Sequence, residues 1–173
     1  METKCIQIPP GFQMDMEVCS EVAIIFCPDA RLRSYHKLLF REGLGLGKRP
    51  EEYTCLPFYG GAAVLAHPEY FPDEVNLIRT SLGIANAHFG ASRLVAIGHE
   101  RCLRMKGLYD QIHGGLDPDR VLDDMLTVRR MFQERSVSSK CPVRKMFAQF
   151  DITLDVILMK FPTRNNLEYV VID

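Results

Sequence analysis

The sequence has no block of basic residues and almost no net charge. Its 21 lysine and arginine residues are balanced by 22 aspartate and glutamate residues, which gives a formal charge of -1 at pH 7. Binding to nucleic acid or to an anionic membrane surface requires a concentration of positive charge. The composition therefore gives no electrostatic support for a nucleic-acid or membrane partner, and small neutral or anionic molecules remain as candidates.

Long apolar segments are also missing. No apolar run approaches the roughly 20 residues that span a bilayer. Residues 1–20 contain acids, two prolines and no continuous apolar stretch of the kind found in a secretory signal. We therefore expect a soluble, cytoplasmic protein. In that compartment the six cysteines stay mainly as thiols, so metal binding or catalysis is the better explanation for any cysteine that needs one.

No internal repeat, low-complexity tract or linker divides the chain. It has 173 residues, of which 47% are hydrophobic, and it can therefore bury a core without disulfides. We expect a single domain over residues 1–173, in which residues 1–20 form an N-terminal arm.

Strand and helix patterns alternate along the chain. Apolar, β-branched runs predict strands at 21–27, 53–64 and 92–99. Apolar residues at helical spacing, with glycines that can end a helix, predict helices at 33–47, 71–90, 101–112 and 118–135, with a turn at 113–119. Residues 151–173 read as two strands around a turn at 163–166. This order predicts an α/β fold, with a mostly parallel β-sheet flanked by helices and a C-terminal antiparallel edge hairpin.

Side chains that can bind a metal follow two of these strands. Cys27 ends the first strand, His99 ends the strand at 92–99, and Cys102 lies three residues later. In parallel α/β sheets, functional groups gather beyond the carboxyl ends of the strands. If the two strands are neighbours, two thiolates and one imidazole converge, and this set suits zinc with a fourth position left open. Taken singly, a cysteine at the end of an apolar strand is more often a small buried hydrophobe than a ligand, and a lone histidine is more often a hydrogen-bonded structural residue.

An acid and a base follow Cys27 at alternate positions. On an extended segment Cys27, Asp29 and Arg31 point the same way, so two arrangements compete for the carboxylate. Asp29 either fills the fourth zinc position, or pairs with Arg31 and leaves that position to water. A plain salt bridge at the end of the strand, worth about 0–1 kcal/mol if exposed, is the simpler alternative.

The order Cys-x-Asp-x-Arg, a glycine-bearing loop and Gly-His-x-x-Cys resembles the β-class carbonic anhydrases, over about Glu21 to Cys102. The resemblance implies zinc held by Cys27, His99 and Cys102, with an Asp29–Arg31 dyad beside it. The implied reaction is reversible hydration of carbon dioxide to bicarbonate by zinc-bound hydroxide. It also implies a homodimer or a higher homo-oligomer, in which the subunit interface helps to wall the active site.

The sequence departs from that family in the loop after the second strand. Members of the family carry an Arg-Asn-Ala-Gly-like loop, whereas this chain has "FYGGAA", with Tyr59, Gly60 and Gly61, and Leu103 stands where the family has glycine. Backbone N–H groups of Gly60 and Gly61 can still bind a substrate oxyanion. The altered loop keeps two alternatives open: a hydrolase of carbonyl sulfide or carbon disulfide, and a zinc-binding protein that has no carbon dioxide hydration activity.

The other cysteines and histidines have simpler interpretations. Cysteines without a ligand-like partner at short spacing are expected to be ordinary thiols, namely Cys5, Cys19, Cys55 and Cys141. Four histidines are expected on the surface or at helix caps, namely His36, His67, His88 and His113. His67 and His88 are also candidates for a proton shuttle if they border the cleft.

Overall fold

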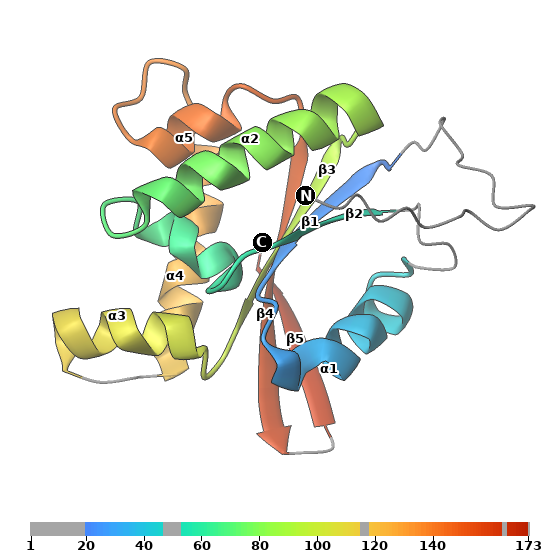
Figure 1. Cartoon of the computed structure of the whole chain (residues 1–173), viewed down its shortest axis with the longest axis vertical. Helices are drawn as coiled ribbons and strands as arrows, with labels where there is room; N and C mark the ends of the chain where they lie inside the picture. Colours follow the sequence, from blue (N-terminus) through green and yellow to red (C-terminus); the bar gives the residue numbers. More distant parts are fainter. Residues whose placement is uncertain (1–19, 47–52, 115–117, 164–165, 173) are drawn as a thin grey trace, which may run out of the picture.

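The computed structural model describes residues 20–46, 53–114, 118–163 and 166–172 (Figure 1). The expected N-terminal arm, with Cys5 and Cys19, lies outside these residues except for Ser20. Residues 115–117 and 164–165, in the turns expected at 113–119 and 163–166, also lie outside them. No helix within the described part of the chain is long and apolar enough to cross a membrane.

The described residues build a five-stranded sheet with the strand order β2-β1-β3-β4-β5. Its strands are β1 (Val22–Phe26), β2 (Tyr53–Pro57), β3 (Arg93–His99), β4 (Thr153–Thr163) and β5 (Asn166–Ile172). The first four strands in this order run parallel, and β5 pairs antiparallel with β4 as an edge strand. This confirms the predicted fold class, including the C-terminal hairpin.

Helices cover both faces of the sheet (Figure 1). One face packs against α2 (Pro72–Phe89), α4 (Pro118–Gln133) and α5 (Pro142–Phe147), and against a 3-10 helix, η4 (Gly61–Ala66). The other face packs against α1 (Arg33–Leu38) and the π-helical turn η2 (Leu39–Gly43), whose Leu39 and Phe40 lie against the strands. Both faces of β1 and β3 are therefore buried, which explains their continuous apolar sequences.

Helical spacing identified the buried face of α4 correctly. Val121, Met125, Val128 and Phe132 repeat at three-to-four spacing, and all four are buried in the main core. α2 also begins at the expected proline, and Gly90 follows it as a left-handed C-cap with φ of 72°.

Two predicted elements need correction, and one helix was not predicted. The strand expected over 53–64 ends at Pro57, because Gly60 and Gly61 adopt positive φ angles and turn the chain into η4. The helix expected over 33–47 is described as helical only to Gly43. α5 was not predicted, because six residues are too few to display a clear helical period.

Candidate metal centre

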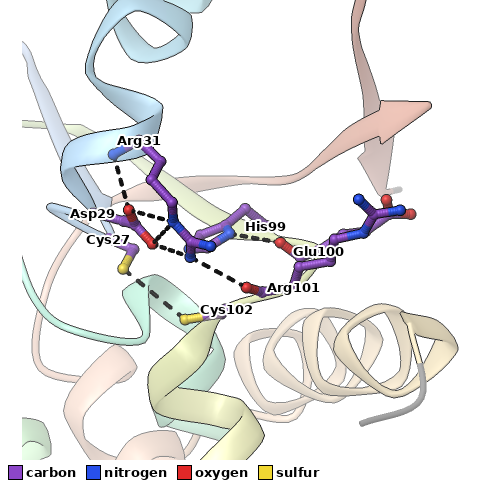
Figure 2. Close-up of polar contacts among 7 residues, drawn as sticks. All are labelled: Cys27, Asp29, Arg31, His99, Glu100, Arg101 and Cys102. Carbon is purple, nitrogen blue, oxygen red and sulfur yellow. Dashed lines mark hydrogen bonds and ion pairs between the residues drawn. The ribbon is translucent and has the colours of Figure 1, made fainter. Parts of the chain in front are cut away.

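Cys27, His99 and Cys102 meet at the carboxyl edge of the sheet. β1 and β3 are neighbours, with Ile25 opposite Ala96, so the ends of these two strands lie together. Cys27 follows β1, His99 is the last residue of β3, and Cys102 is the N-cap of α3 (Leu103–His113). Their ligand atoms all lie within 4.8 Å of one another, and all three residues are buried (Figure 2). The expected convergence of these side chains is therefore confirmed.

The two sulfur atoms have the spacing of thiolates that share one metal ion. The Sγ atoms of Cys27 and Cys102 are 4.0 Å apart, far beyond the length of about 2.05 Å of a disulfide. Two zinc–sulfur bonds of about 2.3 Å at a tetrahedral angle place the sulfur atoms about 3.8 Å apart. The pair therefore needs little movement to bind zinc.

His99 presents one free ring nitrogen to the same point. Its Nδ1–H donates to the Glu100 carbonyl at 2.8 Å, which leaves Nε2 with the lone pair. Nε2 is buried and has no hydrogen-bond partner among the described residues. An unsatisfied buried nitrogen is costly, and a metal ion would satisfy it. The residues present therefore fit a zinc ion.

Backbone groups support both thiols. The Gly60 N–H donates to Cys27, and the N–H groups of Arg104 and Met105 donate to Cys102 at the start of α3. The hydrogen bond between the thiols lowers the pKa of Cys27 to about 4 and raises the pKa of Cys102. Without a cation the pair thus favours one thiolate, and a bound dication would favour two.

The turn between His99 and Cys102 contains one unusual backbone position, and a closely packed glycine precedes the turn. Arg101 has a φ of 57°, which is uncommon for a residue with a side chain. A Cβ atom at Gly98 would lie 2.5 Å from the sulfur of Met125 in α4, so a larger residue there would require the Met125 side chain to move. Gly98 precedes His99 in the sequence, but no local sequence pattern indicates that α4 packs against this glycine.

Asp29 is bound by Arg31. The Arg31 Nε donates to the two carboxylate oxygens at 2.9 and 3.0 Å, one Nη nitrogen donates to Oδ2, and the Arg31 backbone N–H donates to Oδ1 at 2.9 Å (Figure 2). This hydrogen bonding holds the pKa of Asp29 at about 2. Of the two arrangements considered from the sequence, the structure has the one in which the carboxylate pairs with arginine.

The local backbone at this pair differs from the expectation. The segment is not extended, because residues Ala30–Leu32 form the 3-10 helix η1 with Asp29 as its side-chain N-cap. The turn, and not strand alternation, brings Asp29 and Arg31 together. The same guanidinium reaches the Arg101 carbonyl at 3.5 Å and so contacts the turn that carries the other two candidate ligands.

A cavity of about 270 Å³ opens beside the thiols. Its described lining residues are Cys27, Pro28, Asp29, Ala30, Tyr59, Cys102, Leu103 and Arg104. Gly60 and Gly61 are not among them. The Gly61 N–H donates to the Phe58 carbonyl at 2.7 Å, and the Gly60 N–H donates to Cys27. Both glycine amides are used inside the protein, which does not support their assignment to substrate binding.

Among the histidines outside the centre, His36 differs from the expected surface or cap position, whereas His67, the C-cap of η4, and the exposed His88 agree with it. His36 is buried against Phe26 and Phe40 instead of exposed, and burial lowers its pKa to about 4. His67 is half-buried and binds Asp124 through Nε2 at 2.7 Å. His88 is exposed near the end of α2. Neither His67 nor His88 is among the described residues that line the cavity, so the structure gives no support for a proton shuttle.

Fold and site together define an α/β protein with a candidate Cys-His-Cys metal centre at the carboxyl edge of its sheet. A carbonic anhydrase from Glaciozyma antarctica matches this structure with a TM-score of 0.50 and 15% identity, over 92% of this chain and 86% of that chain. A carbonic anhydrase from Streptococcus mutans matches with a TM-score of 0.49 and 16% identity, over 92% and 86% of the two chains. The chain therefore has a β-carbonic-anhydrase-like fold. No family model and no curated protein matches the sequence.

Proposed function

We propose that this protein is a zinc-dependent, carbonic-anhydrase-like lyase that catalyses the reversible hydration of carbon dioxide to bicarbonate. The observation that carries the proposal is the meeting of two thiols 4.0 Å apart with an imidazole nitrogen that has no hydrogen-bond partner in the described part of the chain, beside a carboxylate held by arginine. The carbonic-anhydrase-like fold supports the same activity without establishing it.

In this proposal Cys27, His99 and Cys102 hold the zinc. Bound zinc supplies Lewis acidity, which lowers the pKa of a coordinated water toward 7 and makes hydroxide available at neutral pH. The Gly60 N–H and the first N–H groups of α3 hold the two thiolates in place. The hydrogen bond from Nδ1 to the Glu100 carbonyl keeps the His99 ring turned so that Nε2 faces the metal position.

Asp29 and Arg31 orient the reacting groups. Arg31 keeps the Asp29 carboxylate ionised and away from the metal position, so that Oδ1 or Oδ2 can accept a hydrogen bond from water in the cavity. Pro28, Ala30 and Leu103 give the cavity apolar wall area that suits a small neutral molecule. Asp29 and Arg31 are therefore the proposed catalytic pair.

The test is stopped-flow carbon dioxide hydration by zinc-replete protein between pH 6 and 9. Hydrolysis of carbonyl sulfide and carbon disulfide is measured in parallel, with Cys102→Ser as the metal-site control. Hydration by wild type but not by the variant supports the proposal. Turnover restricted to the sulfur compounds would reassign the substrate, and zinc-replete protein that turns over none of the three would be a zinc-binding protein without this activity.

We also propose that the protein works in the cytoplasm as a homodimer or higher homo-oligomer. The reducing cytoplasm keeps Cys27 and Cys102 available as thiols. The edge strand β5 supports self-association, because Tyr169, Val170 and Val171 are each 40% or more exposed.

A further inference from the structure

We infer that Arg104 is an anion-binding residue of the cavity, and that Glu74 competes with the anion for its guanidinium. The inference rests on the proposed function, because the anion in question is the bicarbonate-class product or substrate. Arg104 is not among the site residues that the sequence motifs or the glycine loop predicted.

Arg104 reaches the cavity from the first turn of α3. Its side chain passes close to Gly60, where an added Cβ would lie 3.5 Å from Arg104 Cγ. It lines the cavity beside the thiols, and also lines a second cavity of about 230 Å³ with Tyr70, Phe71, Gly107, Leu108 and Gln111. Arg104 therefore lies between the two cavities.

Two residues at the start of α2 hold this guanidinium. The Glu74 carboxylate accepts a hydrogen bond from Arg104 Nη2 at 2.8 Å. The Phe71 ring lies under the guanidinium, with 5.1 Å from Cζ to the ring centroid. The arginine and glutamate side chains are about half and about one-third exposed, so the ion pair is weak enough to exchange with a competing anion.

The charges around the cavity show why an anion needs Arg104. Two thiolates cancel the charge of a dication, and Arg31 is committed to Asp29. Among the described residues that line the cavity, Arg104 is the one with a cationic side chain. A monoanion beside Asp29 is therefore balanced by Arg104, whose planar fork matches a carboxylate-like pair of oxygens.

The experiment measures nitrate binding to zinc-replete protein by isothermal titration calorimetry. Nitrate has the planar three-oxygen shape of bicarbonate but does not react. Arg104→Gln is expected to raise the dissociation constant about tenfold, the usual loss for one charge-assisted hydrogen bond. Glu74→Gln is expected to lower the constant severalfold, because it frees the guanidinium. Arg130→Gln is the matched charge control. Arg130 is exposed, and the preceding residue, Arg129, donates to the Leu154 carbonyl at the amino end of β4, opposite the carboxyl ends of the strands where the cavity lies.

The double variant separates competition from a general charge effect. If Glu74 acts through Arg104, then Arg104→Gln/Glu74→Gln binds nitrate as weakly as Arg104→Gln alone. If Glu74 only repels anions at a distance, the second substitution tightens binding in that background as well, and the competition is wrong. Equal effects of Arg104→Gln and Arg130→Gln, or no nitrate binding to wild type, would overturn the inference. Nitrate binding that depends on Arg104 in a protein without carbon dioxide hydration would refute the proposed function and leave the anion site standing.

Discussion

The sulfur atoms of Cys27 and Cys102 lie 4.0 Å apart although 75 residues separate them in the chain. This geometry predicts about one zinc per chain, bound through both thiolates and His99. Cys102→Ser should release the metal, whereas Cys141→Ser, outside the cluster, should keep it. Elemental analysis of the protein and of both variants, purified under reducing conditions, measures the zinc content of each. Metal-free wild type that also refuses added zinc in a competition titration would contradict the site.

Arg31 is expected to matter for activity and not for metal binding. Arg31→Ala frees Asp29 to turn toward the metal position, so carbon dioxide hydration should fall about 100-fold or more, as for other losses of a positioned acid or base. Zinc content should stay near one per chain. Arg31→Lys keeps the charge but loses the planar fork, and should recover only part of the rate. Stopped-flow hydration rates and zinc content, measured on the same samples, separate an effect on activity from an effect on metal binding. Full activity in Arg31→Ala would exclude a catalytic role for the Asp29–Arg31 pair.

Gly61 is expected to be irreplaceable for stability. It has a φ of 59°, and a Cβ atom there would lie 2.6 Å from the Ile97 carbonyl oxygen. Gly61→Ala should therefore lower the free energy of unfolding by about 3 kcal/mol. Gly107→Ala, inside α3 with no neighbour among the described residues within 4 Å of the added atom, should raise it by about 0.5–1 kcal/mol. Urea denaturation of both variants provides the comparison, and equal effects would refute the steric argument.

The ion pair of His67 and Asp124 predicts a pH-dependent contribution to stability. Burial lowers the pKa of His67, but the hydrogen bond and charge of Asp124, with a smaller effect of Glu69, outweigh it and raise the pKa above 6.5. The contribution is therefore complete below about pH 6.5 and disappears as pH rises through the folded-state pKa.

His67→Gln tests this directly. It should reduce the free energy of unfolding by about 1.5–3 kcal/mol at pH 6, the range for a hydrogen bond to a charged group, and by less at pH 8. The exposed His88→Gln is the control. Urea denaturation from pH 5.5 to 8.5 measures the free energy of unfolding of each variant. A loss on His67→Gln that grows as pH rises would show that His67 is bound in its neutral form.

Self-association is expected to involve the exposed edge strand β5. Light scattering at micromolar concentration should give a dimer or a larger assembly, and Val170→Lys should shift it toward monomer, because a charge on an edge strand opposes pairing. Val137→Lys changes an equally apolar residue, 65% exposed, away from the sheet and should have no effect. A monomeric wild type would remove the support for an active site at a subunit interface.

The sequence by itself determined the class of fold and the candidate ligands. Continuous apolar runs marked β1 and β3 because strands buried on both faces need apolar residues at every position. Cys27, His99 and Cys102 were identifiable because each lies at or shortly after the end of a strand, where parallel sheets collect functional groups. The helical period of α4 likewise identified its buried face, because local periodicity follows from backbone geometry alone.

Tertiary structure alone decided which of these elements meet. Periodicity does not give strand order, so only the folded sheet shows that β1 and β3 are neighbours and that the thiols converge. The turn of η1, which pairs Asp29 with Arg31, replaced an expected extended segment. Arg104 and Glu74 are 30 residues apart, and their contact depends on how α2 and α3 pack. Such contacts have no local signal, because they arise from the packing of elements that are distant in the chain.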